Sequence, residues 1–136
     1  MRRARRGAVA VMLAAGALVG LGACSVSTPS SSPDYSVRDR SGDRVSMADL
    51  HGAPAVLTSW ATWCKECKTL LPALEQLHED QGADGVQVVA VNVNAPGAED
   101  DVLALEHEYG MTMARWRDVD NDFTQAFRSR GVPTSV

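Results

Sequence analysis

Two cysteines, Cys64 and Cys67, have a spacing that both thiol chemistry and metal binding use. An apolar run of strand length begins at Ala55 before them, and leucines from Leu70 to Leu77 recur at helical spacing after them. We therefore expect the pair where a strand leads into the first turn of a helix. Free backbone amides and the helix dipole stabilise negative charge at that point, so the pKa of the Cys64 thiol is expected below that of free cysteine.

Zinc sites and structural disulfides also use this Cys-x-x-Cys spacing. The chain has three cysteines, however, and the third stands at position 24. The three histidines do not form a ligand set with the pair: we interpret them as a loop residue and two residues on polar helix faces, namely His51, His78 and His107. These observations favour a redox pair, with a structural disulfide or a metal knuckle as the alternatives. We expect no metal and no other cofactor.

The segment 60–68, together with Pro72, resembles the active site of the thioredoxin superfamily. In that superfamily the proline kinks the helix that follows the redox pair. A Gly-x-Pro ahead of the expected strand resembles the membrane-anchored TlpA/ResA-type branch, which is of the redoxin (AhpC/TSA) type. The resemblance covers most of residues 35–134. Trp60 and Trp63 are expected to pack around the cysteines, and the resemblance implies that Trp63 contacts the substrate.

Strand-like and helix-like segments alternate over residues 34–136, which predicts an α/β fold. We expect a buried strand over 86–93, a helix over 99–109, an extended piece over 111–118 and a helix over 121–130. The resemblance implies a thioredoxin-like fold, with a mostly parallel sheet and helices on both faces. It also implies that the helix at 99–109 is the central insert of the TlpA/ResA branch.

The sequence from Arg130 to Thr134 resembles the cis-proline loop of the superfamily, which packs opposite the redox pair. The resemblance implies a cis bond before Pro133, with Val132 and Pro133 holding the substrate backbone; an ordinary trans-proline loop is the alternative. In the superfamily a β-hairpin and a helix follow, whereas this sequence stops at Val136. We therefore expect an incomplete domain that lacks the C-terminal β-hairpin and helix, as a truncated piece of a longer protein.

Residues 1–23 have the pattern of a bacterial signal peptide, because four arginines precede 17 uncharged residues. The uncharged run is at or below the short limit for a membrane-spanning helix. The sequence from Leu21 to Cys24 resembles the lipobox of bacterial lipoproteins, which implies that Cys24 is lipidated and becomes the mature N-terminus. An uncleaved anchor is the alternative, and both place the domain outside the cytoplasm. Residues 24–33 are rich in Ser and Pro, as is typical of a tether, which leaves 34–136 as the domain.

Two positions depart from the patterns of the superfamily. Plain thioredoxins carry a buried acid two residues before the first tryptophan, where Thr58 stands here, and a threonine cannot serve as a base. Several ResA-type reductases carry a glutamate three residues after the second cysteine, where this chain has Leu70. A peroxidase would need a threonine three residues before the reactive cysteine, and Ala61 occupies that position.

The chain carries 13 basic and 17 acidic residues, and four of the basic ones lie in the leader. An acidic domain argues against nucleic acid as a partner. The resemblance implies an extracytoplasmic thiol–disulfide oxidoreductase, anchored by lipid to the bacterial cell membrane, in which Cys64 attacks and Cys67 resolves. It also implies that the partners are thiols and disulfides of exported proteins, including apocytochrome c, and a membrane thiol–disulfide electron donor.

Three alternatives to this reductase stay open. The enzyme could run as a disulfide-forming oxidase, because Lys65 favours the thiolate and Glu66 disfavours it. A lipoprotein that binds copper(I) through its two thiolates is a second alternative, although a third soft ligand is missing. An inactive truncated fragment is the third.

Overall fold

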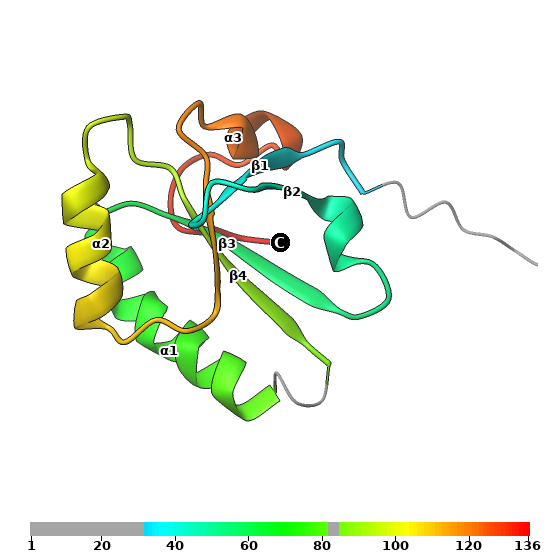
Figure 1. Ribbon diagram of the computed structural model, residues 1–136, viewed down its shortest axis with the longest axis horizontal. Coiled ribbons are helices and arrows are strands. Elements are labelled where there is room, and N and C mark those ends of the chain that lie inside the picture. Colours follow the sequence, from blue (N-terminus) through cyan, green and yellow to red (C-terminus); the bar gives the residue numbers. More distant parts are fainter. Residues whose placement is uncertain (1–31, 82–84) are drawn as a thin grey trace, which may run out of the picture. The chain divides into compact units, whose positions relative to one another are not determined.

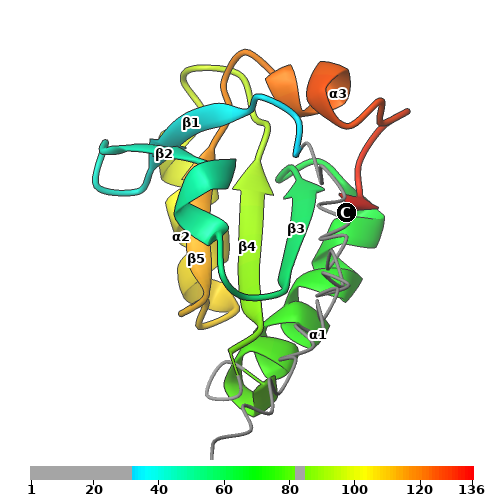
Figure 2. The same cartoon turned by 90° about the vertical axis from the view of Figure 1, so that its right-hand side faces the viewer.

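One sheet of six strands organises the computed structural model, which describes residues 32–81 and 85–136 (Figure 1). The strands lie side by side in the order β2-β1-β5-β4-β3-β6. Their bounds are β1 (Ser36–Asp39), β2 (Arg44–Ser46), β3 (Ala55–Trp60), β4 (Gln87–Asn92), β5 (Ala114–Arg117) and β6 (Thr134–Ser135). The three central strands β5, β4 and β3 are parallel, and the outer pairs are antiparallel. The predicted α/β fold is confirmed, with a mixed sheet whose centre is parallel (Figure 2).

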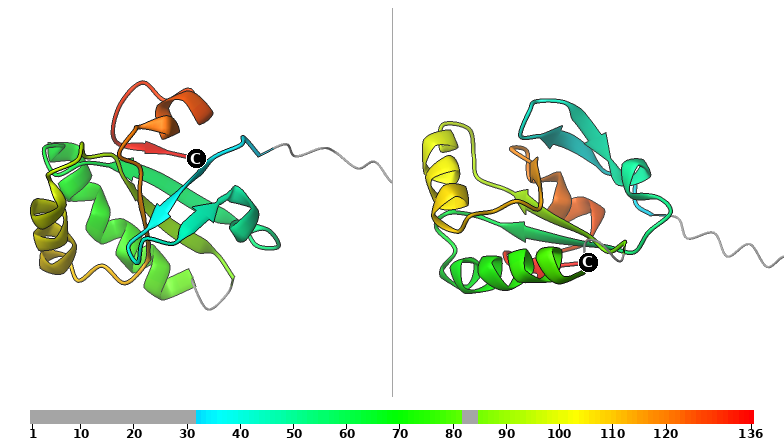
Figure 3. Two further views of the ribbon diagram at one scale, coloured as in Figure 1. Left: turned by 45° about the horizontal axis from the view of Figure 1, so that its top comes forward. Right: turned by 60° about the horizontal axis from the view of Figure 1, so that its bottom comes forward.

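Helices cover both faces of this sheet, as predicted. The long helix α1 (Lys65–Gln81) and the helix α2 (Glu99–Glu108) lie on one face. The short helix α3 (Asp122–Ala126) and the 3-10 turn η1 (Met47–Leu50) lie on the other (Figure 3). The expected extra helix after β4 is therefore present as α2.

The central strand β4 supplies side chains to both hydrophobic cores. Val88 and Ala90 pack in the cluster beneath α1 and α2, whereas Val89 and Val91 pack in the cluster beneath α3. All four side chains are at most 2% exposed. An uninterrupted apolar run is what a parallel strand buried on both faces requires.

The helix near the C-terminus is shorter than the sequence predicts. The apolar pattern indicates a helix over 121–130, but α3 ends at Ala126. Arg128 adopts a left-handed conformation with φ of 51°, and the Ser129 amide then donates to the carbonyl of Thr124. This turn ends the helix and sends the chain toward β6.

The edge strand β6 pairs with β3 next to the redox motif. Thr58 faces Ser135 and Ser59 faces Thr134 in an antiparallel register, and Leu57 exchanges two backbone hydrogen bonds of 2.9 Å with Val136. A short strand of two residues therefore follows the proline loop and pairs with β3. The predicted signal segment and the lipid attachment at Cys24 fall on residues 1–31, outside the part of the chain that the structure describes.

Candidate redox active site

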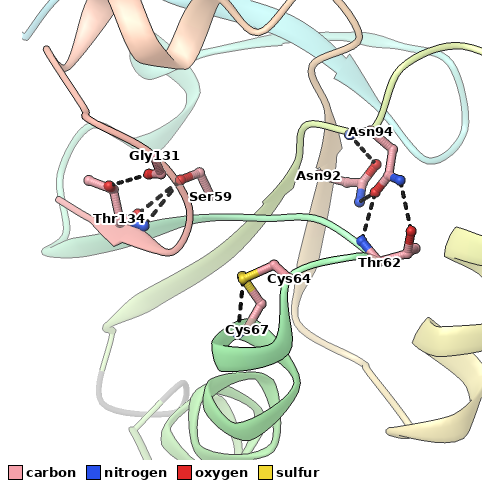
Figure 4. Close-up of a disulfide and its surroundings, with 8 residues drawn as sticks. All are labelled: Ser59, Thr62, Cys64, Cys67, Asn92, Asn94, Gly131 and Thr134. Atoms are coloured by element: carbon pink, nitrogen blue, oxygen red, sulfur yellow. Dashed lines mark hydrogen bonds between the residues drawn. A yellow bond between two sulfur atoms is a disulfide. The ribbon is translucent and has the colours of Figure 1, made fainter.

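Cys64 and Cys67 form a disulfide, with an S–S distance of 2.05 Å, where β3 leads into α1 (Figure 4). The strand-to-helix junction predicted for the pair is therefore observed. The backbone amide of Cys67 donates a hydrogen bond of 3.1 Å to Cys64 Sγ. This amide belongs to the first turn of α1, where amides lack intrahelical partners. After reduction, the same N–H group would stabilise a thiolate on Cys64.

The two sulfur-bearing residues differ in access to solvent. Cys64 is 3% exposed and Cys67 is 0% exposed, so Cys64 is the more accessible of the two residues. Both belong to the hydrophobic cluster beneath α1, together with Leu71 and Leu105.

The two tryptophans of the motif lie in opposite environments. Trp60 is 1% exposed and packs in the same cluster as the cysteines, as predicted. The prediction that Trp63 also packs around the site is wrong, because its side chain is 71% exposed. Trp63 immediately precedes Cys64, where the chain leaves the sheet, and so its ring faces solvent beside the disulfide.

The proline loop lies next to the cysteines and is tied to β3. The peptide bond between Val132 and Pro133 is cis, as predicted. The Val132 side chain packs against the hydrophobic cluster that contains both cysteines. Beyond the proline, the Thr134 amide donates to Ser59 Oγ at 3.2 Å, and the Thr134 hydroxyl donates to the Gly131 carbonyl at 2.7 Å (Figure 4).

A buried amide network, which the sequence reasoning missed, holds the loop that carries Cys64. Asn94 Oδ1 accepts hydrogen bonds of 2.9 Å from the Thr62 amide and from Asn92 Nδ2. Asn94 Nδ2 donates to the Thr62 hydroxyl at 2.8 Å (Figure 4). Asn92 and Asn94 are 1% and 4% exposed. The one signal in the sequence is Asn92 itself, a polar residue within an otherwise apolar strand.

Comparison with known proteins assigns the family. The AhpC/TSA family model matches residues 30–135. The chain belongs to the AhpC/TSA family. It is 41% identical over 81 residues to the thioredoxin-like protein YneN of Bacillus subtilis, covering 59% of this chain and 47% of YneN. It is 30% identical over 111 residues to the thiol-disulfide oxidoreductase ResA of the same organism, covering 82% of this chain and 61% of ResA.

The solved structures support the same fold. A candidate thiol:disulfide interchange protein DsbE from Chlorobium tepidum superposes with a TM-score of 0.69 at 28% identity, over 76% of this chain and 72% of that one. This likeness confirms the thioredoxin-like fold. The chain spans about half to three-fifths of the length of the curated relatives named above.

This family member has a neutral hydroxyl pair where plain thioredoxins carry a buried acid. Thr58 is 1% exposed, and its Oγ1 lies 2.8 Å from Ser135 Oγ. Either hydroxyl can donate to the other, and neither is a base near neutral pH. The buried Thr58 hydroxyl therefore has a hydrogen-bond partner, and neither of the two groups carries a charge. Leu70, where several ResA-type reductases have a glutamate, packs against the hydrophobic cluster instead.

One buried carboxylate, also missed from the sequence, fixes α1 to the segment before β5. Glu75 accepts hydrogen bonds from the Thr112 hydroxyl, from the Thr112 amide at 2.8 Å and from the Met113 amide at 3.2 Å. Burial alone would raise the pKa of Glu75, but these hydrogen bonds and the nearby His78 outweigh it, and the pKa is lowered. The carboxylate is therefore ionised when it holds α1 in place.

Neither a membrane helix nor a metal cluster is found in the described part of the chain. No helix within residues 32–81 and 85–136 has both the length and the apolar character that crossing a bilayer requires. Over the same residues, no group of three or more His, Cys, Asp or Glu side chains is placed to hold a metal ion.

Proposed function

We propose that this chain is a thiol–disulfide oxidoreductase whose Cys64–Cys67 pair exchanges electrons with a disulfide of a partner protein. The observation that carries the proposal is the disulfide at the start of α1, with the Cys67 amide directed at Cys64 Sγ. Similarity to the thiol-disulfide oxidoreductase ResA supports the same activity. Membership of the AhpC/TSA family does not by itself distinguish an oxidoreductase from a peroxidase. Ala61 stands where a peroxidase would need a threonine, which argues against the peroxidase.

The exchange proceeds in two balanced steps. In the reduced chain, the Cys64 thiolate attacks one sulfur of the partner's disulfide, and the other partner sulfur leaves as a thiolate that takes up a proton. The Cys67 thiol then loses its proton and attacks Cys64 Sγ in the mixed disulfide, which releases the second partner thiol. The partner gains two electrons and two protons, and this chain is left with the Cys64–Cys67 disulfide. A dithiol donor reduces that disulfide for the next cycle.

The surroundings of Cys64 suit a polypeptide substrate. We propose that the partner's backbone lies along Val132 and Pro133 on one side of Cys64. The Val132 side chain already contacts the cluster around the cysteines. The exposed ring of Trp63 offers apolar contact area beside the reacting sulfur.

We further propose the cellular setting that the sequence indicates: a reductase held outside the cytoplasm by lipid on Cys24. Its partners would be exported proteins, with apocytochrome c as one candidate, and its electrons would come from a membrane dithiol donor. Detergent-phase partitioning of the full chain checks the anchor. Wild type should enter the detergent phase and Cys24→Ala should not, because stable anchoring needs two or more acyl chains. Equal partitioning of both into the aqueous phase would contradict the anchor.

The activity is tested by reduction of insulin disulfides with dithiothreitol as the electron source. Wild type should accelerate precipitation of the insulin B chain, and Cys64→Ala should not. Cys24→Ala is the matched control, because it also removes one cysteine but leaves the pair intact, and it should keep full activity. Equal rates for wild type and Cys64→Ala would contradict the proposed function.

A further inference from the structure

We infer that a groove between Trp63 and α2 receives the partner polypeptide next to its disulfide and selects a basic residue there. This inference rests on the proposed function, since it specifies the substrate of the same site. The groove measures about 320 Å³. Its walls are Trp63 and Lys68 beside the disulfide, and Asp101, Leu105 and Glu108 on α2.

The groove lies next to the redox pair, because its wall includes Thr62 and Trp63, which immediately precede Cys64. Leu105 lies in its wall and also packs in the hydrophobic cluster that contains Cys64. In Figure 4, Cys64 lies between the Gly131–Thr134 loop on one side and α2, the yellow helix, on the other. A polypeptide bonded to Cys64 Sγ therefore has one flank at the proline loop and the other over the groove.

Ion pairs connect the α2 wall to the sheet. Glu106 is 3% exposed and lies 3.5 Å from Arg115 and 3.8 Å from Arg40. Glu99, at the start of the helix, lies 3.7 Å from Arg117. Arg115 and Arg117 belong to β5, and Arg40 follows β1, so these contacts join α2 to the sheet before a partner arrives.

The chemistry of the walls favours a cation. Asp101 and Glu108 are two helical turns apart on one face of α2, and neither forms an ion pair within residues 32–81 and 85–136. Lys68 is a single positive charge on the opposite wall, so the two carboxylates outnumber it. The exposed face of Trp63 attracts a cation and packs against the aliphatic part of an Arg or Lys side chain. A partner with an acidic residue at this place meets repulsion from α2.

The test uses three peptides with one disulfide each, identical except for Arg, Gln or Glu on both sides of the reactive cysteine. Reduced full-length protein is mixed with each peptide at low ionic strength, and the second-order rate constant is measured in a single turnover. Each value is divided by the rate constant of dithiothreitol with the same peptide, which removes the peptide's own reactivity. Wild type should favour Arg over Glu by roughly tenfold, as a cation–π contact and two exposed ion pairs together provide.

The double variant Asp101→Asn with Glu108→Gln should reduce that preference to less than about twofold while still reducing all three peptides. The matched control removes two exposed charges that do not line the groove, in Glu79→Gln with Asp100→Asn, and should keep the preference. Equal wild-type rates for the three peptides would overturn the groove inference and leave the oxidoreductase proposal intact. Loss of the preference in the control variant, to the same extent as in the groove variant, would also overturn the groove inference and leave the oxidoreductase proposal intact. Failure of wild type to reduce any peptide would overturn both.

Discussion

Two buried polar networks meet at the carboxyl ends of β4 and β5, and they differ in charge. The network around Asn94 consists of amides and a hydroxyl and holds the loop that leads to Cys64. The network on the other face is centred on the Asp118 carboxylate, which accepts hydrogen bonds from the Tyr35 hydroxyl and from the amides of Asp122 and Phe123. The Asp118 amide donates to the Asn92 carbonyl at 2.8 Å, so the two networks share one backbone contact.

The difference separates the tasks of the two regions. The Asp118 carboxylate joins the start of β1 to the start of α3, and burial together with this carboxylate raises the pKa of Tyr35 above its usual range. Tyr35 therefore remains a hydrogen-bond donor at all physiological pH values. Next to the redox pair, the neutral Asn94 network positions Cys64 without adding a negative charge that would disfavour a thiolate. The Asp118 carboxylate therefore anchors the start of α3 to the start of β1, whereas the neutral side-chain amides of Asn92 and Asn94 position the loop that leads to Cys64.

The largest effect is expected from Asp118→Ala, which leaves three donors without their acceptor, two of them in buried hydrogen bonds. The free energy of unfolding should fall by about 3 to 4 kcal/mol in urea titrations. The rate constant of Cys64 with a small disulfide, measured where the variant is folded, should stay within about twofold of wild type. Asp120→Ala, an exposed neighbour, should change neither quantity. If Asp118→Ala does not fold, Asp118→Asn retains one acceptor and gives the same comparison, and a loss of reactivity there would contradict the separation of tasks.

Asn94→Ala should have a smaller effect on stability and a larger one on reactivity. Loss of the amide leaves the Thr62 amide and Asn92 Nδ2 unpaired, at a cost of about 2 kcal/mol. Because the Cys64 loop loses its support, the rate constant for disulfide exchange should fall roughly tenfold. Asn94→Asp retains Oδ1 as an acceptor but introduces a negative charge. Compared with Asn94→Ala, it should therefore restore the free energy of unfolding more fully than the rate constant for disulfide exchange. Wild-type kinetics in Asn94→Ala would show that the network is structural only.

Glu75→Gln should destabilise the chain in a pH-dependent manner. The pKa of Glu75 is lowered in the folded state, so its contribution is fully present above its ordinary value of 4.5 and is lost as the pH falls through the folded-state pKa. The variant should be less stable than wild type by about 1 to 2 kcal/mol at pH 7, because a Gln amide cannot accept from both backbone donors. Urea titrations from pH 7 to pH 3 should show the two proteins converging. A constant difference across this range would contradict the assignment.

The smallest effect is expected from Thr58→Val, which keeps the shape of the side chain and removes its hydroxyl. The Ser135 hydroxyl loses a partner, which costs about 1 kcal/mol. Adding Ser135→Ala removes both hydroxyls and should restore part of that loss. The rate constant for resolution of a mixed disulfide should change less than about twofold in each case, since a neutral hydroxyl is not the base that deprotonates Cys67. A loss of more than tenfold would assign Thr58 a role in proton transfer.

The local features of this site could be predicted from the sequence, whereas the long-range polar contacts could not. The strand-to-helix junction at Cys64 follows from a change of hydrophobic period, and the cis bond at Pro133 was implied by the resemblance of residues 130–134 to the cis-proline loop of the superfamily. Thr62 lies 32 residues from Asn94 and Thr112 lies 37 residues from Glu75 along the chain, and no periodicity links these pairs. Their pairing depends on the register of the folded sheet.

Two predictions failed for identifiable physical reasons. Hydrophobic spacing extended the last helix to Arg130, but the left-handed backbone at Arg128 ends it early, and spacing does not report such a turn. Trp63 was expected to pack around the site, yet it lies on the turn between β3 and α1 and faces solvent. That exposure is understandable if a partner covers the ring.

The central claim, that Cys64 is the nucleophile and Cys67 the resolving cysteine, is tested most directly by trapping mixed disulfides. Reduced Cys67→Ser is mixed with a peptide disulfide, and the adduct is located by mass spectrometry of the digested protein. The account predicts a stable adduct on Cys64 in this variant, and little adduct in Cys64→Ser, because Cys67 is fully buried. Rapid formation of an adduct on Cys67 in Cys64→Ser, with none on Cys64 in Cys67→Ser, would contradict it.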